Sequence, residues 1–288
     1  MSTHSSVAVT SPVPPAQVFQ PARASVLAWV LALLVAAGVI PWVGNDYWFS
    51  AVLVPFLVFS LAGLGLNILT GYTGQLSVGS AAFMAIGAFA TYNFALRLPG
   101  LPLPLSMVLG ALVAGAFGVL VGLPSIRIKG FYLIVSTLAA QFFVQWVLVK
   151  FAWFSNYNAS GVITAPKLQV AGLDLSSPAG RYVYTLLVVA LLTWVARNLV
   201  ASATGRNWMA VRDMDVAASV IGIRPVYAKL TAFAVSSFFV GVAGALWGFV
   251  HLGSWEPAAF SIDRSFQLLF MIIIGGLGSI MGSFFGAA

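Results

Sequence analysis

Long apolar stretches follow one another along almost the whole chain, separated by short polar segments. Eight of them are candidate membrane spans: 25–43, 49–69, 81–96, 105–123, 131–151, 182–200, 230–250 and 266–274. In a bilayer every backbone N–H and C=O group must be paired within the protein, which leaves helices and closed barrels as spanning structures. The alternating pattern of membrane barrel strands is missing. The sequence therefore predicts an all-α, polytopic transmembrane helical bundle with about eight spans.

Composition agrees with a membrane protein. Of the 288 residues, 61% are hydrophobic and 7% are charged, whereas soluble domains average about 25% charged residues. Cysteine is absent, which excludes disulfides and thiol chemistry. The net charge of +7 is assigned to membrane sidedness, so the lipid bilayer is expected as a partner and nucleic acid is not. Residues 1–22, rich in Ser, Pro, Val and Ala, are expected to form a disordered tail before a membrane domain at 23–288.

Positive charges predict the orientation of the spans. With a cytoplasmic N-terminus and strict alternation, the cytoplasmic loops contain eight Lys and Arg residues: Arg23, Arg127, Lys129, Arg197, Arg206, Arg212, Arg224 and Lys229. The outer loops contain five: Arg97, Lys150, Lys167, Arg181 and Arg264. The asymmetry places the polar loop (residues 205–229) in the cytoplasm and the long loop 152–180 outside.

The polar loop is the most polar long segment between two spans. Apolar residues recur in it at three- and four-residue spacing, as on one face of a helix: Val211, Met214, Ala218 and Ile221. A short amphipathic helix therefore fits the stretch from Asn207 to Lys229. Gly222 suits a helix C-terminus, and Pro225 prevents continuation. A charged, helical and firmly terminated loop is typical of a docking site for another protein, and an ordinary solvated loop is the alternative.

Two glycine-rich polar segments interrupt the apolar pattern, one in each half of the chain. They are the first glycine segment (residues 71–80) and the second glycine segment (residues 275–283). Paired glycine-broken segments predict discontinuous helices around a pathway near the membrane midplane. The candidate pathway residues, some able to form neutral hydrogen bonds with a small polar solute, are Gly71, Gly74, Gln75, Ser77, Ser80, Gly275, Gly276, Gly278 and Ser279. Alternatively, the glycines only permit close helix packing.

The pattern of ionisable residues narrows the function. No Asp, Glu or His lies near the centre of a predicted span, which disfavours an ion-coupled carrier but leaves it open beside a self-sufficient channel. No metal-ligand spacing or nucleophile–base set can be assembled within the spans, so an enzyme is not expected. No phosphate-binding loop is present, so any ATP that powers transport must bind to separate polypeptides and no cofactor is expected here.

Three motifs carry a family resemblance. They read GLNILTGYTGQLSVG at 65–79, GRNWMAVRD at 205–213 with Ala217, Ala218 and Gly222 following, and IGGLGS at 274–279. Together they make the chain similar to the permease subunits of bacterial branched-chain amino acid ABC importers, of the type called LivM.

The resemblance implies an ABC importer permease fold in the bacterial inner membrane that translocates Leu, Ile or Val. It also implies a second, LivH-like permease subunit, two cytoplasmic ATPase subunits and a periplasmic solute-binding protein that meets the outer loops. The implied ATPase-coupling residues are Arg206, Arg212, Asp213, Asp215, Ala217, Ala218 and Gly222. Ser80 and Phe131 stand where relatives often have His and an acidic residue, which leaves urea, short amides and aromatic acids open as solutes. Relatives continue beyond the second glycine segment, so a truncated C-terminus is expected.

Overall fold

The computed structural model describes residues 45–98, 100–124, 130–158, 160–166, 169–170, 173–174 and 176–288. The expected tail at 1–22 and the first expected span at 25–43 lie outside these residues. The described α-helices are α3 (Val54–Asn67), α4 (Ser80–Arg97), α5 (Leu103–Gly122), α6 (Phe131–Lys150), α7 (Pro178–Ala201), α8 (Ala203–Asp213), α9 (Asp215–Val220), α10 (Pro225–Leu246), α11 (Ile262–Gly275) and α12 (Ile280–Ala287). Short helical segments of other types adjoin them: η1 (Trp48–Leu53), η2 (Ile68–Tyr72), η4 (Trp247–Leu252) and η5 (Pro257–Phe260).

Six described helical segments are long and apolar enough to cross a membrane: 48–72, 103–122, 131–150, 178–201, 225–252 and 257–275. The predicted all-α polytopic bundle is confirmed, whereas the expected count of eight spans is not. The span expected at 81–96 is the helix α4, which is not among the six. It carries polar residues such as Thr91 and Asn93, and these are buried against neighbouring helices rather than lipid.

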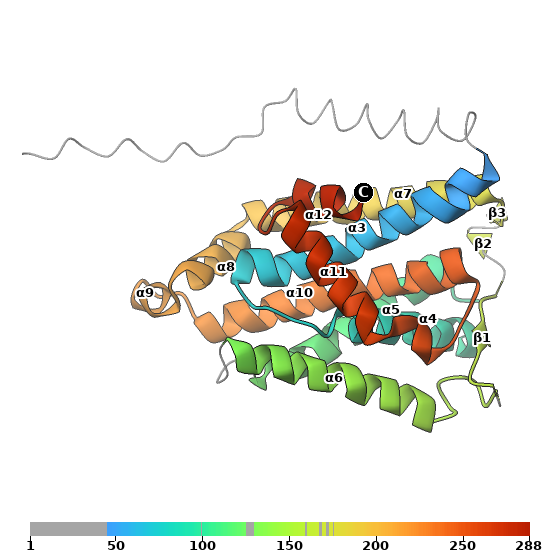
Figure 1. Ribbon diagram of the computed structural model, residues 1–288, viewed down its shortest axis with the longest axis horizontal. Helices are drawn as coiled ribbons and strands as arrows, with labels where there is room; N and C mark the ends of the chain where they lie inside the picture. Colours follow the sequence, from blue (N-terminus) through green and yellow to red (C-terminus); the bar gives the residue numbers. More distant parts are fainter. Residues whose placement is uncertain are drawn as a thin grey trace, which may run out of the picture.

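Helix α10 lies within the bundle and packs against α3, α4 and α5 (Figure 1). Glycines bring α4 and α10 unusually close. A Cβ atom on Gly87 would lie 2.1 Å from the carbonyl oxygen of Gly241, and one on Gly244 would lie 2.0 Å from that of Met84. Small residues at helix contacts are typical of membrane bundles, where close backbone approach drives association. The outer helices α6, α7 and α11 instead leave many large apolar side chains exposed, as helices facing lipid do.

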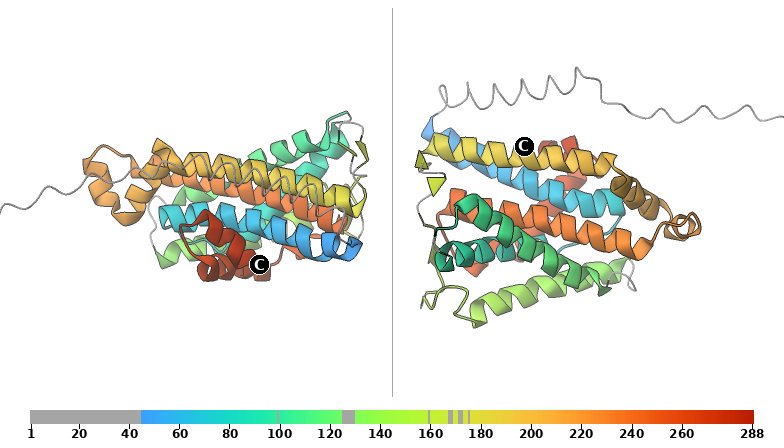
Figure 2. Two further views of the ribbon diagram at one scale, coloured as in Figure 1. Left: turned by 90° about the horizontal axis from the view of Figure 1, so that it is seen from above. Right: turned by 180° about the vertical axis from the view of Figure 1, so that it is seen from behind.

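The two ends of the bundle differ. Helices α8 and α9 project from one end, and the short strands lie at the other (Figures 1 and 2). Strand β1 (Ile163–Thr164) pairs antiparallel with β4 (Ser254–Trp255), and β2 (Gln169–Val170) pairs antiparallel with β3 (Leu173–Asp174). On the orientation predicted from charge, the strands lie at the outer end and α8–α9 at the cytoplasmic end.

Candidate functional site

The polar loop contains two short helices before α10 begins, so the prediction of a single amphipathic helix was wrong. Helix α8 ends at Asp213, the backbone of Met214 is extended with φ −161° and ψ 100°, and α9 begins at Asp215. The predicted apolar stripe is therefore divided. Val211 and Ala218 are buried, whereas Met214 and Ile221 are 64% and 73% exposed.

An ion pair accounts for the change of direction at Met214. The carboxylate of Asp215, the first residue of α9, lies 3.6 Å from Nζ of Lys229 in α10. A carboxylate in the first turn of a helix is also favoured by the helix dipole. The ion pair joins the start of α9 to the first turns of α10, and the dipole interaction stabilises α9 itself.

Gly222 ends α9, as predicted. Its φ of +89° is in the left-handed region that glycine adopts without strain. The N–H of Ile223 donates to the carbonyl of Ala218 at 3.0 Å, and the N–H of Gly222 donates to that of Ser219 at 3.1 Å. This pair of bonds is the Schellman motif of helix C-termini. Pro225 then begins α10, where its missing N–H needs no partner.

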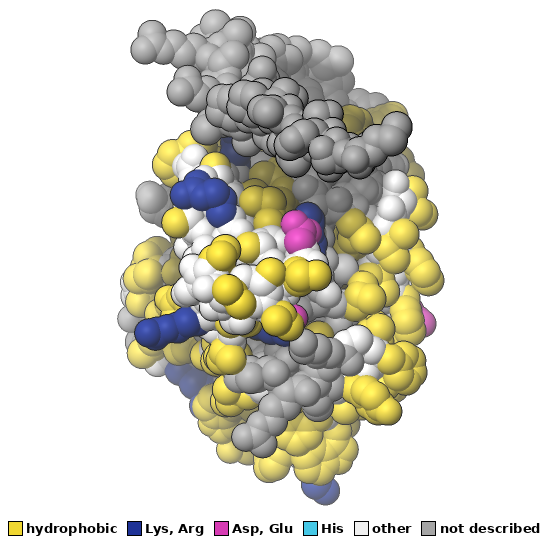
Figure 3. All heavy atoms as spheres, turned by 90° about the vertical axis from the view of Figure 1, so that its left-hand side faces the viewer, with side chains coloured by type: hydrophobic (Ala, Val, Ile, Leu, Met, Phe, Trp, Pro, Cys, Tyr) yellow, Lys and Arg dark blue, Asp and Glu magenta, His cyan; other side chains and the backbone are white. Residues whose placement is uncertain are grey.

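Helix α8 is anchored to the bundle, whereas α9 presents an apolar tip. Trp208 of α8 is fully buried, and its Nε1 donates to Oγ1 of Thr231 in α10 at 3.1 Å. The apolar tip consists of four side chains that are 64% to 83% exposed: Met214, Val216, Val220 and Ile221. Figure 3 views this end of the molecule, with hydrophobic, Lys, Arg and acidic side chains on one face. A clustered apolar tip with a charged surround is typical of a protein interaction site.

The first glycine segment leaves the helix after η2 and runs through the protein interior before α4 begins at Ser80. One of its backbone N–H groups and two in the first turn of α4 are paired with buried side chains of α6 and α11. The N–H of Val78 donates to Thr137 Oγ1 at 3.1 Å. Those of Ala81 and Ala82 donate to Ser265 Oγ at 2.9 Å and to Gln141 Oε1 at 2.6 Å. Irregular backbone at membrane depth needs such burial or a cavity.

Sequence reasoning did not single out Thr137, Gln141 or Ser265. All three are buried. Their only signal in the sequence was that they are polar residues inside or beside apolar spans, and pairing them with the start of α4 required the fold.

The two glycine segments meet at Asn67, the last residue of α3. Its amide nitrogen donates to the carbonyl of Ser279 at 2.8 Å and to Oγ of Ser283 at 3.0 Å. Its amide oxygen accepts from the N–H of Gly278 at 2.8 Å. Gly71 completes the contact, because a Cβ atom there would lie 2.3 Å from the nitrogen of Gly278. The motifs of the two halves of the chain are therefore one assembly in space.

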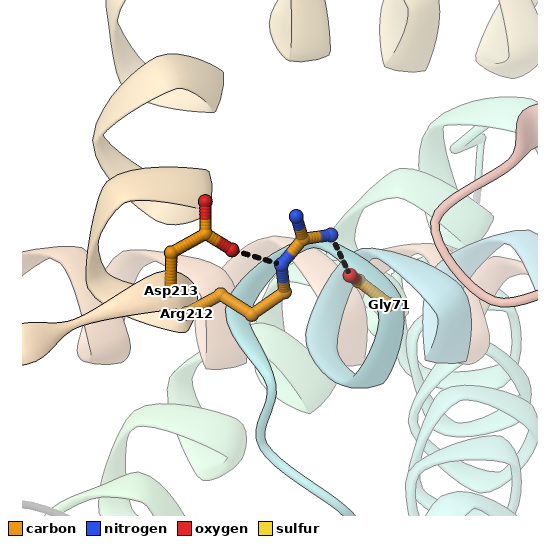
Figure 4. Close-up of polar contacts among 3 residues, drawn as sticks. All are labelled: Gly71, Arg212 and Asp213. Carbon is orange, nitrogen blue, oxygen red and sulfur yellow. Dashed lines mark hydrogen bonds and ion pairs between the residues drawn. The ribbon is translucent and has the colours of Figure 1, made fainter.

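Arg212 connects the polar loop to this assembly (Figure 4). Its Nη1 donates to the carbonyl oxygen of Gly71 at 3.0 Å, and its Nε donates to Oδ1 of Asp213 at 3.0 Å. A cavity of about 360 Å³ lies at this junction. Its lining includes Thr73, Gly74, Gln75, Leu133, Arg212, Asp213, Asp215 and Lys229.

The structure brings together only part of the predicted site. Among the pathway candidates, Gly74 and Gln75 line the cavity, whereas Ser77 and Ser80 are buried away from it. Gly275 and Gly276 lie where α11 ends, and Ser279 caps α12 by accepting from the N–H of Gly282. Among the coupling candidates, Arg212, Asp213 and Asp215 line the cavity, and Ala218 is buried. The remaining three are exposed and lie outside the cavity: Arg206, Ala217 and Gly222. In the described part of the chain, no three His, Asp and Glu side chains are grouped to hold a metal ion.

Six apolar spans packed around a buried, glycine-broken segment define a multi-pass helical membrane protein. The chain belongs to the family described as branched-chain amino acid transport system / permease component, whose model matches residues 48–288. This confirms the resemblance predicted from the three motifs. The relatives it matches are named as transport permeases, not as enzymes.

Two similar relatives are the high-affinity branched-chain amino acid transport system permease proteins LivM of Salmonella typhimurium and Escherichia coli. Each is 32% identical over 248 residues, which cover 77% of this chain and 57% of the relative. The chain thus spans little more than half of their length. A third relative, the fructose import permease protein FrcC of Rhizobium meliloti, is 28% identical over 287 residues, covering 93% of this chain and 75% of the relative. No solved structure matches the chain significantly.

Proposed function

We propose that the chain is the membrane-spanning permease subunit of an ATP-driven ABC importer that carries branched-chain amino acids across the bacterial inner membrane. The observation that carries the proposal is a series of contacts that leads from the apolar tip of α9 through Arg212 to the carbonyl of Gly71. A partner that binds the tip acts directly on the backbone where both glycine segments meet.

The proposal includes the partners of an ABC importer. Two cytoplasmic ATPase subunits bind ATP, and one of them grips the apolar tip of this chain. A second permease subunit completes the pathway, and a periplasmic solute-binding protein delivers solute to the outer loops. The names of the LivM relatives support this assignment, because they describe permease proteins of a high-affinity branched-chain amino acid transport system.

Two contacts of α8 transmit movement of the polar loop to the bundle, one through Trp208 and one through Arg212. Trp208 joins α8 to α10 through its bond to Thr231, so we expect these two helices to move together. Arg212 is the connection from α8 to η2, since its guanidinium bonds the Gly71 carbonyl. When the ATPases close, displacement of α9 is passed to Gly71 and to the first glycine segment, which changes the cavity that Gly74 and Gln75 line.

The test uses cells that lack the chain and are complemented with variants in the complete transporter. Ile221→Asp places a charge on the apolar tip and is expected to abolish ATPase co-purification and the uptake of labelled leucine. Tyr157→Asp is the matched control, because Tyr157 is equally exposed, at 73%, and lies in the loop predicted to be external. It should retain the ATPase. Normal leucine uptake with Ile221→Asp would overturn the coupling role.

Two further variants separate docking from transmission. Gly222→Pro disrupts the end of α9 and is expected to prevent docking. Arg212→Glu leaves the apolar tip in place but removes the bond to Gly71, so the ATPase should co-purify while leucine uptake is lost. Labelled fructose is tested beside leucine, since FrcC is a relative over most of this chain. Uptake of fructose and not leucine would overturn the proposed solute and leave the permease role standing.

A further inference from the structure

Arg264 is half-buried in a helix, although the sequence placed it in an outer loop. Helix α11 begins at Ile262, earlier than the expected start at Phe266, so Arg264 is in its first turn. Phe260, four residues before Arg264, accepts hydrogen bonds at its carbonyl from Gln141 and Gln145 of α6. The following residue, Ser265, bonds the N–H of Ala81 at the start of α4. These contacts lie on either side of Arg264, which is within the candidate membrane span 257–275.

The Arg264 guanidinium lies over two aromatic rings. Its central carbon is 5.2 Å from the ring centroid of Trp247 and 5.6 Å from that of Phe59. The imidazole ring of His251 stacks on the ring of Trp247, with 4.3 Å between the two ring centroids. Cation–π contacts of this kind hold a guanidinium in place without neutralising its charge.

Arg264 has no ion-pair partner among the described residues, although the exposed Asp263 is its neighbour in the first turn of α11. Nη1 donates to the neutral amide oxygen of Gln267 at 2.9 Å. The ion pairs among described residues are Arg212–Asp213 and Lys229–Asp215, so no described carboxylate pairs with Arg264. A cation within membrane depth is costly unless it faces a partner or water, and such residues mark solute pathways. Its place in the first turn of α11 adds to the positive helix dipole, which also favours an anion there.

We propose that Arg264 binds the α-carboxylate of the translocated amino acid, with the rings of Phe59 and Trp247 fixing the orientation of its guanidinium. The planar guanidinium matches a carboxylate through two parallel hydrogen bonds. This inference rests on the proposed function, since it requires an amino acid as solute. The site lies in a different part of the bundle from the cavity at Arg212, so it adds a solute contact that the polar loop does not provide.

The test compares Arg264→Gln and Arg264→Lys with Arg97→Gln in the complete transporter. Arg97 is a matched control because its guanidinium also lies over a ring, 3.6 Å from the centroid of Trp153, but at the exposed end of α4. Loss of a charged hydrogen-bond partner predicts at least about a tenfold fall in leucine uptake at low concentration for Arg264→Gln. Arg264→Lys keeps the charge and should recover part of the rate, while Arg97→Gln should remain within about twofold of wild type.

The outcomes separate this inference from the proposed function. If the wild-type transporter takes up no leucine, the proposed solute is overturned, and so is the carboxylate-binding role of Arg264. If the wild type takes up leucine and Arg264→Gln is equally active, the inference is overturned while the function stands. If Arg264→Gln loses its co-purified permease partner, Arg264 is a structural charge at a subunit interface, and the inference is again overturned. Reduced leucine uptake by a fully assembled complex supports it.

Discussion

The two glycine segments break helices in similar ways but occupy different environments. In the first, Thr73, Gln75, Ser77 and Ser80 are each 5% exposed or less. In the second, Leu277 is 50% exposed, against 40% for Leu76 of the first, and the turn at Gly276 and Gly278 is half-buried, with φ of +114° and +74°. The first segment depends on polar side chains from α6 and α11, whereas the second is held chiefly by Asn67.

The difference shows that a glycine-rich interruption does not by itself indicate a solute pathway. The first glycine segment carries irregular backbone into the interior, where each N–H needs a partner. The second glycine segment closes a turn against α3 and fixes the position of Gly71, to which Arg212 is bonded. We therefore expect substitutions at the meeting point of the segments to have larger effects than substitutions within either one.

Gly71→Ala should have the largest effect on stability. The added Cβ would lie 2.0 Å from Oδ1 of Asn67 and 2.3 Å from the nitrogen of Gly278, so backbone would have to move. We expect a loss of about 3 kcal/mol or more, measured as a lower melting temperature of the purified protein. Gly63→Ala in the preceding helix is the control, because its nearest neighbour would be Ile272 at 3.5 Å, an ordinary contact. Equal melting temperatures for the two variants would contradict the close contact of the segments.

Asn67→Ala should have the next largest effect. It removes three hydrogen bonds and leaves the part-buried N–H of Gly278 without its partner. The expected loss is about 2 to 3 kcal/mol, since an unsatisfied buried group costs more than the bond itself contributes. Ser60→Ala is the comparison, because Ser60 is also buried but bonds only the carbonyl of Phe56 in its own helix. If both variants melted alike, the connection between the glycine segments would be energetically unimportant.

The sequence predicted much of the architecture and less of the site. Apolar length located the helices, and Gly222 with Pro225 located the end of α9, because these signals are local. The division of the polar loop at Met214 depends on the pairing of Asp215 with Lys229, and the position of Arg264 depends on contacts of Phe260 with α6. Contacts between residues distant in sequence leave no periodic pattern, so they could not be read from one chain.

Gln141→Leu tests the support of the first glycine segment. Gln141 accepts from the N–H of Ala82 and from the hydroxyl of Ser265, and it donates to the carbonyl of Phe260 at 3.0 Å, so its loss removes three buried hydrogen bonds. We expect about 1 to 3 kcal/mol of destabilisation. Gln145→Leu, one turn away, loses a bond to the same Phe260 carbonyl but none to α4, and its effect should be smaller. The reverse order of melting temperatures would mean that the start of α4 does not depend on α6.

Ser279→Ala should have the smallest effect and defines what holds the second glycine segment. The hydroxyl of Ser279 accepts from the N–H of Gly282 at 3.2 Å and caps α12, a contribution of about 1 kcal/mol. Ser177 caps α7 in the same way, accepting from Gly180 at 3.2 Å, so Ser177→Ala should lower the melting temperature by a similar amount. The carbonyl of Ser279, which bonds Asn67, is unaffected by the change. If Ser279→Ala lowered the melting temperature as much as Asn67→Ala, the helix cap and not Asn67 would position the second glycine segment. The contact between Arg212 and Gly71 would then depend on α12.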